Sequence, residues 1–240
     1  MNTYYLEKEK ERVITRYPRV VTSLHQIEIT SRCNLTCKYC PSPKLQRPKV
    51  DMDMATYKRA LEWVNYYVLR GTQGELNLAG IGESTMHPDF VEYVRLARGA
   101  VGPGGRLVLA TNGLLITDEM VAALKPFNPL IWVSLHRPEK AGPAIEVLKK
   151  YGLLSGVSGD PSYAAIDWAG QVEGWFVSAQ KGVCDWLKSG WTMVMADGRL
   201  STCCLDASGA GVIGHVNNQV GDAGVSPYGL CSGCHLSVPN

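Results

Sequence analysis

The sequence predicts an α/β protein: a partial, open TIM-like βα barrel followed by a small C-terminal domain of β-hairpin and loops. Apolar runs of strand length alternate with helical segments at short intervals, which is typical of a parallel sheet with crossover helices. The alternating part, residues 21–178, is too short for a closed eight-unit barrel of roughly 250 residues. Hairpin and cysteine signals follow in residues 179–240, and residues 1–20 form a polar lead-in.

The barrel begins with Leu24–Thr30, an apolar alternating run that predicts a strand. Asp53 can cap a helix that ends near Gly71, because apolar residues recur at helical spacing between them. Glu75–Ala79 predicts the next strand. In the predicted helix between Asp53 and Gly71, the apolar positions are Tyr57, Ala60, Leu61, Val64 and Val68.

A second helix is expected to begin at a capping residue, Asp89, and to lead into the strand Arg106–Ala110. His87, just before this helix, is expected to be structural. Thr117 or Asp118 can cap the helix that comes next. The buried stripe of the second helix is predicted to be Phe90, Val91, Val94 and Ala97.

The last predicted barrel strand is Leu130–Val133, and Pro143 suits the first turn of a helix that ends near Gly152. The glycine-rich sequence from Ser155 to Gly174 favours neither a helix nor a strand. The barrel is therefore expected to end in this region.

A hairpin is predicted beyond it, with strands at Trp191–Met195 and Leu200–Cys204 joined by the turn Ala196–Arg199. Five cysteines surround this hairpin: Cys184, Cys203, Cys204, Cys231 and Cys234. Four thiolates from a hairpin and a terminal loop can enclose a cubane iron–sulfur cluster, and local chemistry alone would equally allow zinc.

Composition sets the outer limits on function. The 240 residues are 45% apolar with a formal net charge of +2, which gives no electrostatic argument for nucleic-acid binding. The segment Met1–Lys10 is too polar for a signal peptide, and no apolar run is long enough to cross a bilayer. Eight cysteines without an export signal indicate metal binding in a reducing compartment, so a cytoplasmic location is expected.

Three cysteines, Cys33, Cys37 and Cys40, follow the first strand with the spacing Cys-x-x-x-Cys-x-x-Cys. Three thiolates on one loop can hold three irons of a cubane cluster and leave the fourth iron open to another ligand. A disulfide framework does not suit three closely spaced cysteines in a chain of this size. Zinc sites favour pairs of ligand pairs over a three-cysteine loop at a strand end.

This cysteine spacing, with the aromatic Tyr39 before the third cysteine, resembles that of the radical S-adenosylmethionine (radical SAM) superfamily. Gly80-Ile81-Gly82-Glu83 resembles the family motif whose glycines let the backbone approach the SAM amino group, with Ser84 where a proline is usual. The resemblance implies a SAM-binding 4Fe-4S cluster on the three cysteines. It also implies that the cofactor-binding residues are Tyr39, Gly80, Gly82, Glu83, Asn112, Ser134 and His136.

The order of the C-terminal cysteines is similar to the auxiliary-cluster module of this superfamily, in the short Twitch form related to the SPASM domain. That resemblance implies one auxiliary 4Fe-4S cluster held by Cys184, Cys203, Cys231 and Cys234. Cys204 is then left over. It can be a small buried hydrophobe, or a hydrogen-atom donor to a substrate radical as in epimerases of the superfamily.

The resemblance implies a radical SAM oxidoreductase that cleaves SAM reductively and removes a hydrogen atom from its substrate. The auxiliary cluster suggests oxidation of a small hydroxylated metabolite or modification of a peptide. An external one-electron donor such as flavodoxin or ferredoxin is expected, and neither a nucleic acid nor a membrane is an expected partner. The alternatives are an epimerase with Cys204 as donor, a glycyl-radical activase, and a zinc-binding interaction protein.

A proline-rich loop follows the three cysteines and carries three positive charges, Lys44, Arg47 and Lys49. These charges can meet an anionic substrate or the carboxylate of SAM. They can equally be solvated loop residues.

Overall fold

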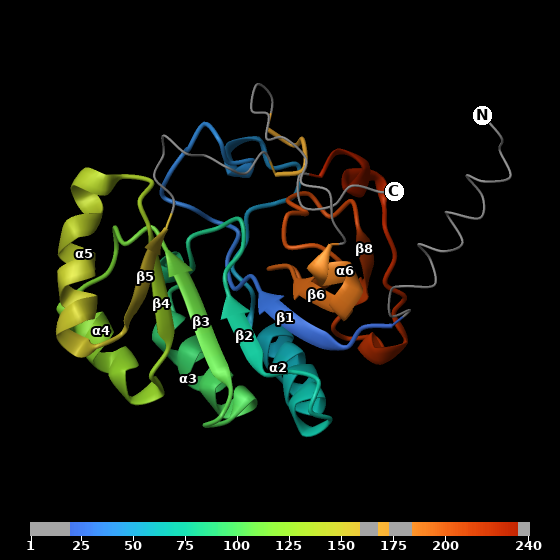
Figure 1. Ribbon diagram of the computed structural model, residues 1–240, viewed down its shortest axis with the longest axis horizontal. Helices are drawn as coiled ribbons and strands as arrows, with labels where there is room; N and C mark the ends of the chain where they lie inside the picture. Colours follow the sequence, from blue (N-terminus) through green and yellow to red (C-terminus); the bar gives the residue numbers. More distant parts are fainter. Residues whose placement is uncertain (1–19, 159–167, 173–183, 235–240) are drawn as a thin grey trace, which may run out of the picture.

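One open sheet organises the part of the chain that the computed structural model describes, residues 20–158, 168–172 and 184–234. Eight strands lie in the order β5-β4-β3-β2-β1-β6-β7-β8 (Figure 1). The pairs from β5 through β1 to β6 are parallel, and β7 and β8 add antiparallel pairs at one edge. This is the open α/β arrangement that the alternating sequence pattern predicted.

The parallel part is built from short strands with matched registers. Leu78 lies beside Ile27 on one side and Leu109 on the other, and Leu109 lies beside Ile131. Because partners in register point to the same face, these apolar side chains form one buried row. The strands are β1 (Ser23–Ile27), β2 (Glu75–Leu78), β3 (Arg106–Thr111), β4 (Leu130–Ser134) and β5 (Leu154–Ser158).

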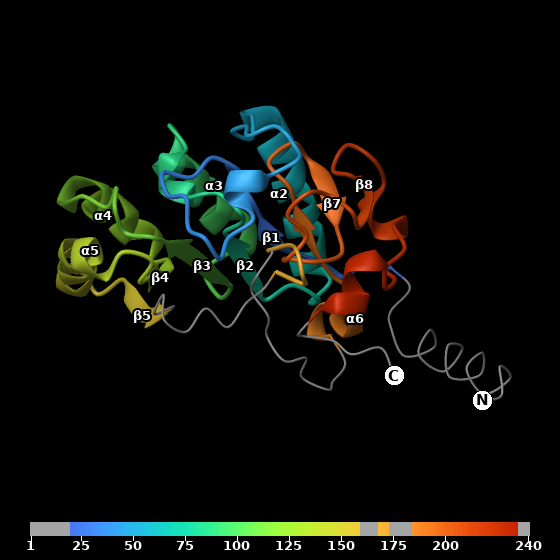
Figure 2. The same cartoon turned by 90° about the horizontal axis from the view of Figure 1, so that it is seen from above.

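Helices connect successive parallel strands, and Figure 2 shows α2, α3 and α4 along one face of the sheet. Two predicted caps are confirmed: Asp53 accepts the N–H of Thr56, and Thr117 accepts the N–H of Met120. Asp89 occupies the N-cap position of its helix, but its side chain makes no capping hydrogen bond. The helices are α2 (Met54–Leu69), α3 (Phe90–Val101), α4 (Asp118–Leu124) and α5 (Pro138–Tyr151).

Two sequence-based predictions for this region were wrong. Helix α5 begins at Pro138, so Pro143 lies inside the helix and not in its first turn. Pro138 occupies the first position of the helix, where the N–H that proline lacks would have no hydrogen-bond partner within the helix. The strand β5 was not predicted at all, because Gly156 lowers the strand signal. Its glycine has a packing reason: a Cβ there would overlap the ring of Trp132 on the neighbouring strand.

The cysteine-rich C-terminal part extends the same sheet. Strand β6 (Trp191–Val194) pairs in parallel with β1, and the predicted hairpin joins β6 to β7 (Arg199–Ser201). Gly198 in its turn has φ +84°, a conformation that favours glycine. Strand β8 (Val212–His215) completes the edge, and the short helix α6 (Asp185–Ser189) precedes β6. The predicted domain boundary at residues 178 and 179 and the lead-in 1–19 lie outside the described residues.

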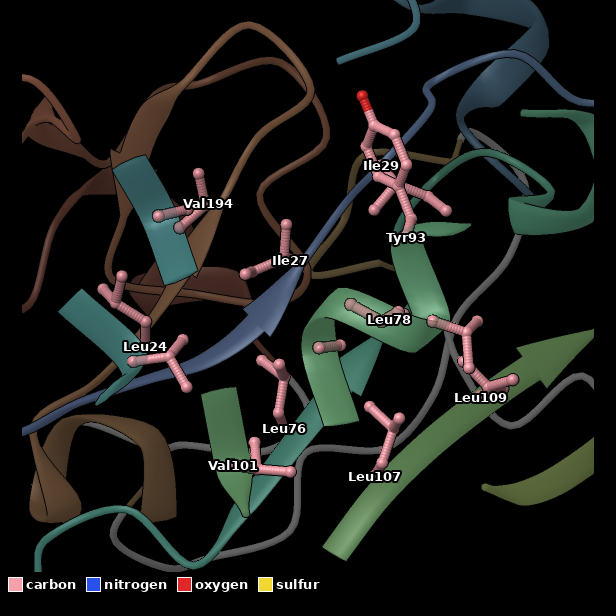
Figure 3. Packing of buried hydrophobic residues seen from close by; sticks show 14 of the residues in the cluster. Leu24, Ile27, Ile29, Leu76, Leu78, Tyr93, Val101, Leu107, Leu109 and Val194 are labelled. Carbon is pink, nitrogen blue, oxygen red and sulfur yellow. The ribbon is translucent and has the colours of Figure 1, made fainter. Parts of the chain in front are cut away.

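The main core lies between the sheet and its helices. Figure 3 shows side chains of β1, β2 and β3 meeting Tyr93 and Val101 of α3. Tyr67 and Tyr93 are buried, whereas the predicted core positions Val68 and Val91 are only partly buried. A second, smaller core contains Ala169, Leu205 and Cys234, with Trp168, Cys203, Cys204 and Leu230 packed against it.

Short 3₁₀ turns complete the described structure, at Ser42–Lys44, Ser84–Met86, Lys125–Phe127, Val220–Asp222 and Gly229–Gly233. Among the described residues, no helix is long and apolar enough to cross a membrane.

Candidate functional site

A cavity of about 130 Å³ lies at the carboxyl ends of the central strands, where α/β barrels gather their chemistry. It brings together the three cysteines of the first motif, the glycine-rich turn after β2 and the polar residues after β3 and β4. Its lining is Cys33, Leu35, Cys37, Cys40, Ala79, Gly80, Ile81, Gly82, Glu83, Ala110, Thr111, Asn112, Ser134, His136 and Trp168. Every predicted cofactor-binding residue except Tyr39 is part of this lining.

The loop that carries the three cysteines is fixed to neighbouring segments at its start, around Cys33. Arg32 donates from Nε to Asp51 Oδ1 at 2.9 Å and from Nη2 to Oδ2 at 2.5 Å. Asn34 Oδ1 accepts a 2.7 Å hydrogen bond from Asn112 Nδ2, which ties the loop to the end of β3. The start of the loop is therefore held before any metal binds, which lowers the cost of ordering the first ligand.

The thiols of the first cysteine set are free and partly exposed. Burial raises the pKa of Cys33, and it raises the pKa of Cys40 to about 11. A metal must therefore displace protons from these thiols, since the thiolate is the ligand form. Three free thiols facing one cavity fit a cubane cluster with one iron open to a further ligand.

The turn after β2 packs so closely on the cysteine loop that it needs glycine. A Cβ at Gly82 would overlap the carbonyl oxygen of Thr30 and lie 2.7 Å from that of Arg32. A Cβ at Gly80 would lie 2.5 Å from Cγ of Glu28. Contacts inside the protein thus require both glycines, in addition to the predicted approach of a cofactor.

Glu83 fixes the polar residues at the ends of two strands. Its carboxylate is buried and accepts hydrogen bonds from Thr85 N and Oγ1, from Thr111 Oγ1 at 2.7 Å and from Asn112 N at 2.7 Å. These donors neutralise much of the cost of burying the charge. The structure therefore assigns Glu83 a positioning contact toward Asn112, whose own side chain reaches the cysteine loop.

Tyr39, outside the cavity lining, contacts His136, which is part of it. The Tyr39 hydroxyl lies 2.7 Å from His136 Nδ1, which joins the cysteine loop to the segment after β4. Burial, followed by the charge of Arg137, lowers the pKa of His136, so the imidazole favours its neutral form. Ser134 lines the same cavity at the end of β4.

Sequence reasoning missed a buried ion pair beneath the glycine turn. Arg47 Nη2 lies 2.8 and 2.6 Å from the carboxylate oxygens of Glu28, and Arg47 Nε donates to Ala207 O at 2.7 Å. Glu28 also accepts the N–H groups of Ile81 and Ala196. The solvated-loop interpretation was therefore wrong for Arg47. A polar residue inside an apolar strand was the only available signal for Glu28.

A second cavity brings together the four cysteines predicted to hold the auxiliary cluster. Cys184 lies at the N-cap of α6, Cys203 follows β7, and Cys231 and Cys234 lie in and after the last 3₁₀ turn. All four are free. Four thiols around one apolar cavity fit a fully ligated cubane. Ala169, Leu187, Thr202, Tyr228 and Leu230 complete the lining.

Asp206, a residue that the sequence did not single out, organises the loop after Cys203. Its buried carboxylate accepts a 2.7 Å hydrogen bond from Ser201 Oγ and bonds from the N–H groups of Gly209, Ala210 and Gly211. A carboxylate that satisfies four donors fixes this loop tightly. Asp206 thereby holds the loop that carries two adjacent cysteines.

Cys204 lies outside the linings of both cavities and packs against the smaller core. Its thiol hydrogen-bonds to Cys203, and this contact lowers the pKa of Cys203 to about 7. Whether Cys204 has a catalytic role stays a prediction.

A site for a single metal ion needs ligands that converge on one point, whereas a cubane cluster does not. Within the described ranges, no group of three or more His, Cys, Asp or Glu converges to hold one metal ion. In a cubane each cysteine binds a different iron, so its ligands do not need to converge on one point.

Comparison with known sequences identifies the family. The sequence model of the Radical SAM superfamily matches residues 27–169, which is more than half of the chain. The chain belongs to the radical SAM superfamily. Members use a 4Fe-4S cluster and SAM, in agreement with the cysteines at the first cavity.

Three individual relatives each match over less than half of this chain. The chain is 37% identical over 101 residues to a tungsten-containing aldehyde ferredoxin oxidoreductase cofactor-modifying protein of Pyrococcus furiosus, which covers 41% of this chain and 26% of that protein. It is 27% identical over 103 residues to an S-adenosyl-L-methionine-dependent 2-deoxy-scyllo-inosamine dehydrogenase of Niallia circulans, covering 42% and 40%. A PqqA peptide cyclase of Gluconobacter oxydans is 33% identical over 102 residues, covering 40% and 25%. The chain thus spans less than half the length of these relatives.

Solved structures share the fold. BtrN in complex with AdoMet and 2-DOIA superposes with a TM-score of 0.67 at 20% identity, over 81% of this chain and 78% of that one. Native anSMEcpe with bound AdoMet gives a TM-score of 0.59 at 15% identity, over 81% and 78%. At these identities the likeness establishes the fold alone, which is the partial barrel of radical SAM enzymes.

Proposed function

We propose that this protein is a two-cluster radical SAM oxidoreductase that oxidises a small hydroxylated metabolite. One observation carries the proposal: two separate cavities collect two separate sets of cysteines that form no disulfide bond, three in the first and four in the second. The first set leaves an iron open for SAM, and the second leaves none open. Such a division suits one site that starts the radical chemistry and one that exchanges electrons only.

In the first cavity, Cys33, Cys37 and Cys40 hold the SAM-binding cluster. A cluster bound there would supply the electron for the reductive cleavage of SAM. The protein orients SAM and excludes water around it. Gly80 and Gly82 let the turn pack closely against Glu28 and Thr30, and this packing sets the position of the turn backbone that lines the cavity.

Three polar residues at strand ends surround the reacting centre. Asn112 and Ser134 offer hydrogen bonds to SAM or to substrate hydroxyls from the ends of β3 and β4. His136 favours its neutral form because burial lowers its pKa, so it can accept a proton from a hydroxyl. Tyr39 holds the His136 ring through the 2.7 Å contact at Nδ1.

In the second cavity, Cys184, Cys203, Cys231 and Cys234 hold the auxiliary 4Fe-4S cluster. The surrounding apolar side chains keep water away from the sulfurs, which is one of the means by which a protein sets a cluster potential. An external one-electron donor such as flavodoxin or ferredoxin reduces the protein.

The substrate class rests on the relatives. One is named as a dehydrogenase of an inosamine, which supports oxidation of a hydroxylated ring. Others are named as peptide cyclases, which makes a peptide the second substrate class. Turnover assays with hydroxylated small molecules and with peptides distinguish the two substrate classes.

Metal analysis of the anaerobically reconstituted full chain tests the proposal. We expect about eight irons and eight sulfides per chain, and about four of each after Cys33, Cys37 and Cys40 are replaced together by Ala. With SAM and dithionite, the unaltered protein should form 5′-deoxyadenosine and the triple variant should not. Two zinc ions and no sulfide would overturn the proposal.

Epimerisation, with Cys204 as hydrogen-atom donor, is the second candidate function. The contact between Cys204 and Cys203 keeps this thiol beside a cluster ligand. Turnover in deuterated solvent would place deuterium on the reacting carbon if a thiol donates the hydrogen. A product without solvent deuterium, formed equally by Cys204→Ala, would exclude this candidate.

A further inference from the structure

One short turn with an unusual backbone contributes to the lining of both cavities. Trp168, Ala169 and Gly170 follow one another with φ values of +53°, +57° and +79°. Residues other than glycine rarely adopt this left-handed backbone conformation, so the two successive non-glycine residues Trp168 and Ala169 are strained. Such strain persists only where surrounding contacts impose it, and it concentrates at functional sites.

The turn contributes one residue to each cavity. Trp168 lines the first cavity, together with the cysteines of the SAM-binding motif. Ala169 lines the second cavity, together with the four auxiliary cysteines. Ala169 also belongs to the smaller core with Cys234, and Trp168 packs against that core. Two adjacent residues with left-handed backbone therefore line two different cavities.

Gln171 supplies contacts that impose this backbone. Its Nε2 donates to Trp168 O at 2.5 Å and to Leu205 O at 2.6 Å. Its Oε1 accepts the N–H of Ala207 at 3.3 Å. Both ends of the amide are used, so the turn is clamped to the loop after Cys203. The contact of Arg47 Nε with Ala207 O continues this connection toward Glu28 and the glycine turn.

We propose that Trp168 is a SAM-contacting residue and that Gln171 is the positioning residue that holds it between the two sites. This inference rests on the proposed function, because it assumes that SAM occupies the first cavity. The indole gives that cavity a flat, polarisable face suited to an adenine ring or to a cationic sulfonium. Because Gln171 bonds to both Trp168 O and Leu205 O, the position of Trp168 depends on the loop of the second site.

SAM binding without reductant provides the test, because no turnover then occurs. Equilibrium dialysis of the reconstituted full chain measures the dissociation constant, and tryptophan emission reports the site directly. We expect Trp168→Ala to weaken SAM binding about three- to tenfold, the range typical of one aromatic contact. We expect Trp168→Phe to lose most of the SAM-induced emission change.

Trp63→Phe is the matched control among the six tryptophans of the chain. Trp63 lies in α2 and donates to Val216 O, away from both cavity linings. This control should keep both the affinity and the emission change. The inference is overturned if Trp168→Ala binds SAM as tightly as Trp63→Phe and Trp168→Phe keeps the full emission change.

Gln171→Glu tests the positioning role with a side chain of the same shape. A carboxylate cannot donate to the carbonyls of Trp168 and Leu205, so the clamp is lost. We expect a smaller SAM-induced emission change and an altered electron paramagnetic resonance spectrum of the auxiliary cluster. A purely structural role would lower the unfolding temperature and leave both signals unchanged, which would contradict the assignment.

Failure of the proposed function would look different. In that case the unaltered protein would contain no sulfide or would not bind SAM. If the unaltered protein binds and cleaves SAM but the Trp168 variants behave like the control, the inference alone is wrong. Should Trp168→Ala fail to fold, Trp168→Phe carries the test.

Discussion

Arg47 and Glu28 form a buried ion pair beside the glycine turn of the first cavity, with side chains that are 3% and 0% exposed. The pair joins the loop after the first cysteines to the end of β1. Glu28 also accepts N–H groups from the ends of β2 and β6, so one carboxylate connects three strands. The arrangement supports the first site and contacts the loop of the second through Ala207.

Removing the arginine should be strongly destabilising. Arg47→Ala leaves the Glu28 charge buried without its partner, and such changes cost about 3–5 kcal/mol of the free energy of unfolding. Urea unfolding of the metal-free chain measures the loss. The matched control is Arg59→Ala, because Arg59 pairs with Glu62 on the exposed face of α2. That variant should lose no more than about 1 kcal/mol. Equal losses in the two variants would contradict the role given to the buried pair.

The close contact at Gly82 leads to a second prediction. Gly82→Ala forces the backbone of Thr30 or of the glycine turn to move, because the new Cβ would overlap a carbonyl oxygen. Overpacking of this kind costs about 1–3 kcal/mol, and the shift reaches Cys33 three residues on. We expect lower stability in urea unfolding and weaker iron loading of the first site.

Gly99→Ala serves as the control for Gly82→Ala. Gly99 lies in α3, and a Cβ there meets nothing within 4 Å. Because alanine favours the helix, this variant should gain about 0.5–1 kcal/mol and keep full iron loading. Iron loss in both variants would show that the close contact at Gly82 is not the cause.

His25 leads to a prediction about pH. Its ring stacks on Trp191 at 4.0 Å, and burial lowers its pKa below the ordinary value of 6.5 despite the opposing charge of Glu75. The unfolded state therefore binds the proton more readily than the folded state. The stabilising contribution is complete above pH 6.5 and is lost as the pH falls below it.

Urea unfolding at several pH values tests this sign. We expect the free energy of unfolding to fall between about pH 7.5 and pH 5.5, and His25→Gln should show a smaller fall over that window. Parallel pH profiles for the two proteins would rule out His25 as a contributor.

Local signals explain why much of the fold was predictable. Cap residues such as Asp53 and Thr117 act within one helical turn, and alternating apolar runs predicted four of the five barrel strands. The missed strand β5 depends on a tertiary contact, the Trp132 ring above Gly156, which no local pattern contains. The start of α5 was missed because two prolines competed for the same helix position.

The candidate site likewise contains features that local sequence predicts and features that depend on long-range contacts. The spacing of Cys33, Cys37 and Cys40 is a short-range motif, and the structure brings all three to one cavity. The pair of Glu28 and Arg47 depends on contacts with residues far along the chain, so only folding reveals it. The strained turn at Trp168 lay in sequence that carried no strand or helix signal.

The adjacent residues Cys203 and Cys204 give the sharpest test of the auxiliary site, because each can be replaced singly and the two variants can then be compared. Cys203 lines the second cavity, whereas Cys204 packs against the smaller core. We expect Cys203→Ala to lose the auxiliary cluster, about four of eight irons, and Cys204→Ala to keep all of them. Iron and sulfide analysis with electron paramagnetic resonance distinguishes the two variants. If Cys204→Ala loses the iron and Cys203→Ala retains it, the fourth ligand is Cys204, and a thiol already bound to iron cannot also donate a hydrogen atom.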